Sequence, residues 1–507
     1  MSESKKTLAF VGVAVLLMGT AVLATWPRER RPAEFVGQGE PFFPNFTDPL
    51  ACTSLEVIDF DEETASAVPF KVELKDGKWV IPSHYDYPAD AKDRLAKTAA
   101  GVIDLKKDVV VSDRPDQWEE LGVIDPLDTK STSLKGRGKR VTLKDKSGEI
   151  LADLIIGKPV PGRSGQRYVR VPDPRQRWTY AVNVNVDLST RFADWIETNL
   201  LKVDTSKIRK VTFDLHKVDP ERRTLEKGEV LTVERKDSTA PWQLEGGLPE
   251  GQELDTAKLS TLTTALADLK IVGVRPKPPG LTQDLKLGDG KVTPTTNQAL
   301  ASLLTKGFYP TRDGLYSNQG EVRVACEDGV VYTLRFGEVT FATGEALSAG
   351  KEEDQPQDKA KGKEKEKDKE GSKAEGVESR YLMVTAAFDS SLIAAPAPPK
   401  VAEAGELPAD VFQRTAQEKA DKEKAEKEKA EREKADYERK VEAGKKRAKE
   451  LTDRFAAWYY VVPGSAFRDI RLDRSALIRP KSESKDTAAP PASGLNFNPG
   501  GLPPGHP

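Results

Sequence analysis

The stretch FKVELKDGKWVI, at residues 70–81, decides the fold that we expect for this chain. Apolar and polar residues alternate on both sides of its central Asp76-Gly77 pair. Such alternation is typical of strands with one buried face, and an Asp-Gly pair between them is typical of a tight hairpin turn. The stretch therefore predicts two antiparallel strands, and LEVIDF (55–60) predicts a strand before them.

A helix is expected after this hairpin, because apolar residues recur at helical spacing through YPADAKDRLAKTAAGVIDLKK (87–107). Beyond it, KRVTLKDKSGEILADLIIGK (139–158) predicts a second hairpin, and QRYVRV (166–171) predicts a further strand. A helix that covers one face of an antiparallel sheet is a stable layered unit. Residues 41–200 are therefore predicted to form a module of the α+β class.

The same order of segments returns downstream, which predicts an internal duplication with a second α+β module at residues 201–400. Trp242 is expected to take the place of Trp79, and Tyr381 the place of Tyr168. The stretches that repeat the first module are IRKVTFDL (208–215), VLTVERKDSTAPWQLEG (230–246), ELDTAKLSTLTTALADLK (253–270), EVRVACEDGVVYTLRFGE (321–338) and SRYLMV (379–384).

Two pentapeptides, RFADW (191–195) and RFAAW (454–458), are also nearly identical. We predict that each lies just after the last strand of its own module. Residues 451–480 would then be a returning segment that completes the second module. The aromatic residues of the pentapeptides, expected to be packing anchors at the i,i+3 spacing of a helical face, are Phe192, Trp195, Phe455 and Trp458.

Three segments of low complexity interrupt or follow the second module. Residues 345–377 include a run that is almost free of apolar side chains, and they predict a disordered insert. Residues 405–450 carry mixed charges with a five-residue repeat, which predicts a solvated single helix acting as a spacer because a heptad seam is missing. Residues 481–507 predict a disordered tail.

The first 30 residues contain an uncharged apolar run at 7–26, long enough to cross about 30 Å of hydrocarbon as a helix. We predict an uncleaved signal-anchor, with a cleaved signal peptide as the alternative. The chain would then be a single-pass protein of the inner (cytoplasmic) membrane, with its bulk in the periplasm. The expected anchor residues are Leu8, Phe10, Val13, Leu16, Leu17, Val22 and Trp26.

Composition excludes several classes of partner. The net charge of −2 and the lack of a basic stripe with aromatic residues argue against nucleic acid. Three scattered histidines predict no metal site, and we expect no cofactor. Cys52 and Cys326 are favoured as separate thiols, and a disulfide is the alternative in an oxidising compartment.

Motifs for catalysis are missing, so we predict that the chain is not an enzyme. It has no phosphate-binding loop and no nucleophile elbow. His84-Tyr85-Asp86-Tyr87 is the one cluster that resembles a catalytic grouping, but no nucleophile accompanies it and a polar loop between strand and helix explains it equally well. The tryptophans, Trp195 among them, are expected in the core, and the alternative is that they line a groove for glycan or peptide.

The stretch from Leu55 to Val171 resembles the bacterial domain-of-unknown-function family numbered 4340. The features that carry the resemblance are VELKDGKWVI, YPADAKDRLAKTAAGVIDLK, EELGVIDP, VTLKDKSGEILADLIIGK and RYVRV, in this order after the apolar N-terminal run. The resemblance implies a membrane-anchored envelope protein that accompanies transport components of the gliding-motility ABC type. It carries over no active-site residue.

The predicted function is that of a non-catalytic envelope protein, an accessory or scaffold for a membrane transport assembly. The expected partners are membrane lipid, through residues 7–26, and subunits of the transport system. The alternative is an extracytoplasmic binding module for envelope polymer or peptide.

Overall fold

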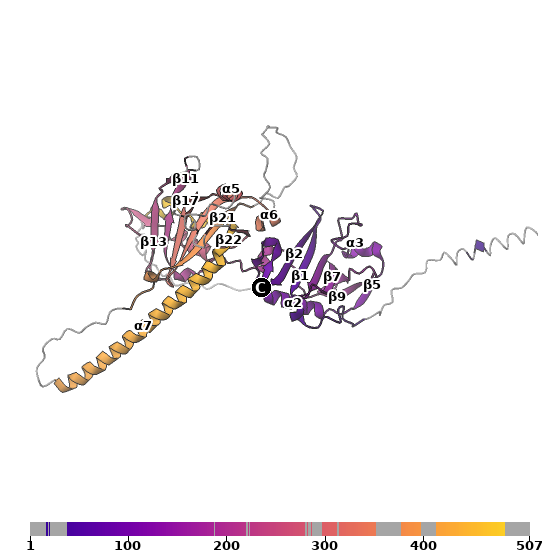
Figure 1. Cartoon of the computed structure of the whole chain (residues 1–507), viewed down its shortest axis with the longest axis horizontal. Coiled ribbons are helices and arrows are strands. Elements are labelled where there is room, and N and C mark those ends of the chain that lie inside the picture. The colour runs from indigo at the N-terminus through magenta and orange to yellow at the C-terminus, as the bar shows by residue number, and fades with distance from the viewer. Residues whose placement is uncertain are drawn as a thin grey trace, which may run out of the picture.

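A computed structural model describes residues 38–186, 188–219, 222, 224–278, 281, 285, 297–311, 314–350, 377–396 and 412–481, together with Leu17, Met18 and Thr20. We call residues 38–200 the first module and residues 201–481 the second module. Each is built on an antiparallel sheet with helices packed around it (Figure 1), so the predicted α+β class is confirmed.

The predicted membrane anchor lies outside the described residues, apart from Leu17, which is exposed. Within the part of the chain that the structure describes, no helix has both the length and the apolar character needed to cross a bilayer.

The first sheet contains the hairpin predicted from residues 70–81. Its strands are β1 (Ser54–Asp61), β2 (Ser66–Lys75), β3 (Lys78–Ile81), β4 (Tyr87–Pro88), β5 (Val109–Ser112), β6 (Lys139–Lys144), β7 (Ile150–Pro159), β8 (Gln166–Arg170) and β9 (Thr179–Asn183). Their order across the sheet is β4-β3-β2-β1-β6-β7-β8-β9-β5. Lys75 pairs with Lys78, and Asp76 and Gly77 between them have positive φ, as the tight turn requires.

The helix predicted at 87–107 begins later than expected, because Tyr87 and Pro88 form β4 and pair with β3. The helix is α2 (Lys92–Ile103), and Leu95, Ala99 and Val102 bury its apolar face as predicted. A short helix, α3 (Trp118–Leu121), follows β5. Both the burial of Tyr87 and the strand pairing at this point are tertiary effects that helical spacing does not encode.

The second sheet repeats the strand order of the first. Its strands are β10 (Ile208–Asp214), β13 (Val230–Glu234), β14 (Gln243–Leu244), β16 (Gly273–Pro276), β19 (Glu321–Cys326), β20 (Val330–Thr340), β21 (Ser379–Phe388) and β22 (Trp458–Pro463). Their order is β14-β13-β10-β19-β20-β21-β22-β16. Taken in position, these strands correspond to β3-β2-β1-β6-β7-β8-β9-β5 of the first sheet.

Smaller elements surround the second sheet. The short strands are β11 (Lys217–Asp219), β12 (Thr224–Glu226), β15 (Gln252–Leu254), β17 (Phe308–Thr311), β18 (Gly314–Ser317) and β23 (Ile478–Pro480). The helices are α4 (Thr256–Ala267), α5 (Asn297–Thr305), α6 (Gly344–Ser348), α7 (Phe412–Ala456), α8 (Gly464–Ile470) and α9 (Arg474–Leu477). On β21, Leu382 and Val384 join the large core, and Tyr381 and Met383 join a smaller core on the opposite face.

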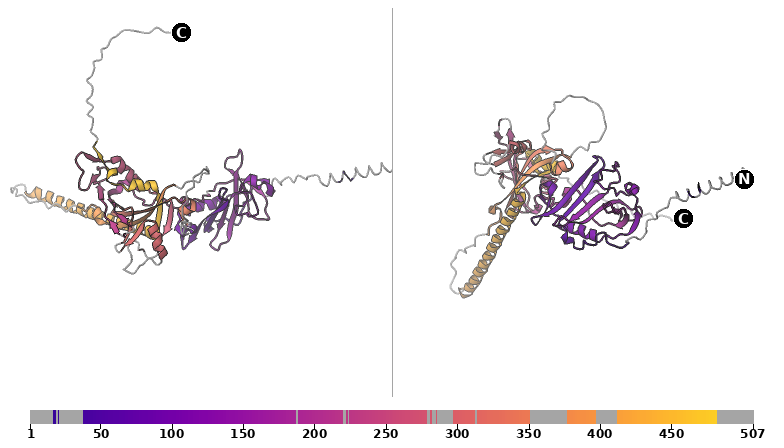
Figure 2. Two further views of the ribbon diagram at one scale, coloured as in Figure 1. Left: turned by 90° about the horizontal axis from the view of Figure 1, so that it is seen from above. Right: turned by 45° about the vertical axis from the view of Figure 1, so that its right-hand side comes forward.

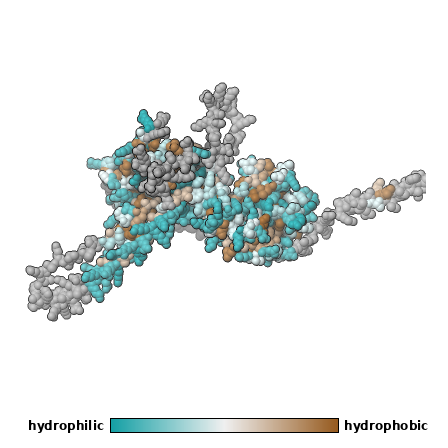
Figure 3. All heavy atoms as spheres, in the orientation of Figure 1, coloured by the Kyte–Doolittle hydropathy of each residue, from teal (hydrophilic) through white to brown (hydrophobic). Residues whose placement is uncertain are grey.

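Helix α7 is the long charged helix, but it differs from the spacer predicted at 405–450. It continues through residue 456, and Ala448, Leu451 and Phe455 bury its last turns against the second sheet. Gly444 allows this contact, because a Cβ there would overlap the carbonyl oxygen of Asp328. The earlier described turns project away from both modules and present a hydrophilic surface (Figures 1 and 3).

The structure corrects the predicted equivalence of the two pentapeptides. RFADW forms a 3-10 helix, Phe192–Trp195, that follows β9. RFAAW instead ends α7 and enters β22, so it precedes the strand that corresponds to β9. Helix α7 therefore belongs to the connection between β21 and β22, and by strand order the counterpart of RFADW is α8. A shared pentapeptide cannot reveal on which side of a strand it lies.

A bulge recurs at the same place in both sheets. The strand register shifts at Gly157 in β7 and at Gly337 in β20. Arg167 donates hydrogen bonds of 2.8 and 2.6 Å to the carbonyl oxygen of Gly157. Arg380 donates one of 2.9 Å to the carbonyl oxygen of Gly337. The bulge and the arginine that satisfies it thus share one geometry in the two modules.

We expect Gly337→Ala to lower the free energy of unfolding by about 1–3 kcal/mol, because its Cβ would overlap the carbonyl oxygen of Lys306. Gly157→Ala should act similarly in the first module, where the Cβ would lie 2.6 Å from the Leu121 oxygen. Urea unfolding measures both effects. Phe341→Ala, at an exposed position, is the control; an equal loss there would contradict the argument.

The two modules lie side by side (Figure 2), and buried apolar residues of both belong to one continuous core. The segment that leaves the first module forms backbone hydrogen bonds with the residues that follow α4. The Leu200 amide donates to the Leu269 oxygen, and the Ile271 amide donates to the Thr198 oxygen, each at 2.9 Å. Shared core and backbone pairing fix the modules to each other.

Candidate functional site

The cluster at His84 has a structural role. His84 Nδ1 lies 2.8 Å from Ser83 Oγ, and Nε2 lies 3.0 Å from Ser348 Oγ in the second module. The ring stacks on Phe192 at 4.1 Å, with 2° between the planes. Asp86 instead pairs with Lys75 at 2.6 Å. Since both ring nitrogens are engaged, this histidine joins the modules and is not positioned as a base.

The tryptophans do not assemble a groove around Trp195. Its side chain is fully buried, and Nε1 donates a 2.9 Å hydrogen bond to the Ser189 oxygen. Trp458 packs edge-on against Tyr87, with 5.1 Å between the rings. Because Trp195 has no exposed surface, it does not line a groove for glycan or peptide. The remaining predicted anchors are buried or half-buried: Trp79, Trp242, Tyr168, Tyr381, Phe192 and Phe455.

Cys52 and Cys326 are separate buried thiols. Burial raises the pKa of Cys52 to about 11 and that of Cys326 to about 12. Since the thiolate is the reactive form, neither is an activated nucleophile.

We expect both thiols to react with a maleimide at least about tenfold more slowly in the native chain than in urea. The native chain should also migrate identically on reducing and non-reducing gels. A mobility shift that Cys52→Ser abolishes would contradict this expectation.

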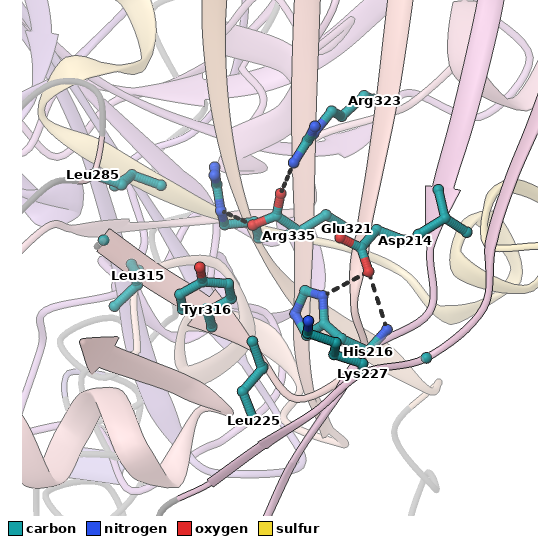
Figure 4. Close-up of a pocket in the computed structure, with 13 residues that line it drawn as sticks. Asp214, His216, Leu225, Lys227, Leu285, Leu315, Tyr316, Glu321, Arg323 and Arg335 are labelled. Atoms are coloured by element: carbon teal, nitrogen blue, oxygen red, sulfur yellow. Dashed lines mark hydrogen bonds and ion pairs between the residues drawn. The ribbon is translucent and has the colours of Figure 1, made fainter. Parts of the chain in front are cut away.

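A polar cavity lies in the second module, at the end of β10 (Figure 4). The cavity has a volume of about 430 Å³. Asp214 and His216 are two residues apart and reach the same cavity, and Tyr316 lies with its ring 5.4 Å from that of His216. Its lining also includes Leu225, Lys227, Glu321, Arg323 and Arg335.

Asp214 fixes the orientation of the His216 ring. Its Oδ1 lies 3.1 Å from His216 Nδ1 and accepts from the His216 backbone amide at 3.3 Å. Because a carboxylate only accepts, Nδ1 carries the proton and a neutral ring presents Nε2 as an acceptor. His216 is 3% exposed, and its Nε2 has no hydrogen-bond partner among the residues that the structure describes. A buried acceptor without a partner is costly unless a ligand satisfies it.

The strand register brings a second charged group to this site. Asp214 on β10 pairs in register with Glu321 on β19, and Glu321 pairs with Arg335 on β20. Glu321 is 5% exposed and accepts from Arg335 at 2.7 Å, while Arg323 is farther away at 3.5 Å. One carboxylate is thus shared by two guanidinium groups.

An apolar cavity of about 550 Å³ adjoins this polar site and shares Leu225 and Tyr316 with it. The other residues that line it are Val218, Thr224, Leu300, Leu304, Thr305, Tyr309, Pro310 and Thr311. Both volumes fall within the usual range of small-molecule sites, about 300–1,000 Å³.

The matching positions of the first sheet lack these polar groups. Leu154 and Leu334 each precede the bulge glycine by three residues, which aligns the two registers. On that alignment, Ile58 occupies the position of Asp214. Arg140 occupies the position of Glu321, and Ile155 occupies the position of Arg335. Ile58 and Ile155 are buried. The cluster is therefore specific to the second module.

The sequence alone did not indicate this site, because His216 has no other histidine or cysteine near it along the chain. The spacing Asp214-x-His216 at the end of an alternating strand was the available signal, since residues two apart point to the same side. Glu321 and Arg335 carried no such signal, because only strand pairing brings them there.

Lys277, just after β16, carries a buried amine. Among the described residues its Nζ has no hydrogen-bond partner, and burial, with a smaller contribution from Arg335, lowers its pKa to about 8.

We expect Lys277→Met to raise the free energy of unfolding by about 1–3 kcal/mol near pH 7. The native chain loses the Lys277 proton near pH 8, whereas the unfolded chain keeps it to about 10.5. The increase in the free energy of unfolding over wild type should therefore be complete below pH 8 and shrink as the pH rises to 10.5. Urea unfolding across this range measures it, with exposed Lys146→Met as control. A gain independent of pH would contradict the argument.

No group of histidine, cysteine and carboxylate side chains suited to a metal ion occurs among the described residues.

Residues 79–285 match the family model described as a domain of unknown function, DUF4340. The match begins in β3 and extends into the second module, beyond the stretch to Val171 that carried the resemblance. No curated protein matches the chain, and neither does any solved structure. The matched stretch therefore supports the assignment of this part of the chain to the DUF4340 family.

Proposed function

We propose that this chain is a membrane-anchored, non-catalytic protein of the cell envelope that serves as an accessory or scaffold for a membrane transport assembly. The observation that carries the proposal is α7, a long helix that projects from a body of two fixed modules (Figure 1). At 1.5 Å per residue, its 45 residues measure about 67 Å.

Helix α7 suits a spacer because its projecting part is solvated and its base is anchored. Its exposed surface carries both charges, as in the pair Lys429–Glu433 at 3.8 Å. At the base, Arg447 reaches Asp328 at 3.5 Å, and Arg454 donates a hydrogen bond of 2.8 Å to the Asn199 oxygen. A rod held in this way keeps a fixed direction relative to the body.

The apolar run at residues 7–26 supports the proposed anchoring, and the family resemblance supports the proposed partnership. We also propose that the bulk of the chain lies in the periplasm. Alkaline phosphatase fused after residue 480 should then be active in cells, and an inactive fusion would contradict this topology.

Co-purification tests the scaffold role. The tagged full chain, cross-linked in cells and solubilised in mild detergent, should recover integral subunits of a transport assembly, identified by mass spectrometry. A variant lacking residues 416–439 should lose them, whereas one lacking the similarly charged residues 352–372 should keep them. Recovery without any transport subunit, or recovery unchanged by loss of 416–439, would contradict the proposal.

We infer that the two modules are copies of one ancestral unit. The shared strand order, the matching bulges and the arginine bound to each bulge support this inference. A superposition of residues 54–183 on 208–463 that failed to align the corresponding strands would contradict it.

The alternative function is an extracytoplasmic binding module. The paired cavities of the second module favour it, whereas the burial of Trp195 removes the groove first considered for polymer or peptide.

A further inference from the structure

We propose that the paired cavities of the second module bind an amphipathic anion with a single apolar chain, such as a fatty acid or an alkyl phosphate. The charged head would lie in the cavity of Asp214 and His216, and the chain in the adjoining apolar cavity. This inference goes beyond the scaffold function and does not depend on it.

Charge in the polar cavity favours an anion. Its described lining holds three cationic side chains, Lys227, Arg323 and Arg335, against the carboxylates of Asp214 and Glu321. Glu321 binds Arg335 closely, which leaves the guanidinium of Arg323 only weakly paired, at 3.5 Å and with 55% of its side chain exposed. An anionic head would complete the pairing of Arg323 with charge-assisted hydrogen bonds.

His216 adds a directional contact. Its buried Nε2 has no partner in the described part of the chain, and Asp214 fixes the ring so that Nε2 can contact a polar atom of the ligand. A neutral ring would accept from the hydroxyl of an acid or of a phosphate monoester, and a protonated ring would donate to an anionic oxygen. Either contact satisfies the atom that the folded chain leaves without a partner.

The apolar cavity is suited to a chain and not to a second charge. Leucine, valine, proline and tyrosine side chains dominate its lining, and its polar side chains are threonines and tyrosines. Leu225 and Leu304 are 42% and 38% exposed, so the wall is open to an entering ligand. Burial of an alkyl chain in such a cavity is favourable, because it removes apolar surface from water.

The lining of the polar cavity argues for binding and against hydrolysis. Among the described residues, it contains no serine, threonine or cysteine that His216 could activate as a nucleophile. At the matching positions of the first module, buried Ile58 and Ile155 replace Asp214 and Arg335. When two similar sheets differ in this way, the ligand is expected to bind only at the sheet that carries the polar residues.

Photolabelling tests the proposal on the full chain in phosphatidylcholine nanodiscs. A photoreactive analogue of laurate should label peptides covering residues 214–230 and 297–316, as mapped by mass spectrometry. Unlabelled laurate or dodecyl phosphate should compete at least about tenfold better than dodecanol, because a charge-assisted hydrogen bond contributes about 1.5–3 kcal/mol. The better competitor of the two anions identifies the head group.

Exposed positions supply variants that keep the fold. Arg323→Gln and Leu304→Asp should each weaken laurate binding about tenfold at unchanged melting temperature, whereas Arg175→Gln, on the surface of the first module, should not. Three results would overturn the proposal: no labelling of these peptides, equal competition by dodecanol, or binding unchanged in both variants. Competition by an acidic peptide as strong as by laurate would also overturn it, in favour of a peptide site.

Discussion

A chain that ends after residue 450 should lose the fold of its second module. The truncation removes β22, which lies between β21 and β16 in the sheet. Tyr460, Val461 and Val462 on this strand have no exposed surface, and the truncation also removes buried Phe455. The loss of several fully buried apolar side chains, at about 2–5 kcal/mol each, exceeds the stability of a typical domain.

Deletion of residues 416–439 should have little effect by comparison. The described side chains of this segment are exposed or half-buried and lie before the buried turns of α7. Both variants are compared with wild type by circular dichroism and thermal melting. The truncated chain should lack the cooperative transition of the second module, and the internal deletion should melt within a few degrees of wild type. An ordered second module in the truncated chain would contradict the role of β22.

Trp195→Ala should lower the free energy of unfolding by about 3–5 kcal/mol. The indole is fully buried, lies 5.8 Å from the ring of Phe70, and has the guanidinium of Arg94 4.8 Å from its centroid. The variant would leave a large cavity in the apolar core and would remove the hydrogen bond from the indole Nε1 to the Ser189 oxygen.

Urea unfolding followed by circular dichroism measures this effect. The control is Trp178→Ala, since that indole is only partly buried against the same core and should cost about half as much or less. Equal losses in the two variants would show that Trp195 is not a central packing residue. A normally stable Trp195→Ala chain would return this residue to consideration as a ligand contact.

The sequence predicted local structure well where a pattern repeats over several residues. The hairpin at 70–81 follows from alternation and its Asp-Gly turn, and the buried face of α2 follows from helical spacing. The helix start was predicted too early, because the pairing of Tyr87 with Ile81 depends on a strand already in place. The family resemblance also followed from sequence, and its match reaches further along the chain than expected.

By itself, then, the sequence determined the α+β class, the main strands and the long charged helix. Only the tertiary structure decided that RFAAW lies before its strand, that His84 joins the two modules, and that Asp214, His216, Glu321 and Arg335 share one cavity. The physical reason is the range of the interactions. Alternation and helical spacing act over a few residues, whereas the cavity depends on strand pairing across more than a hundred residues.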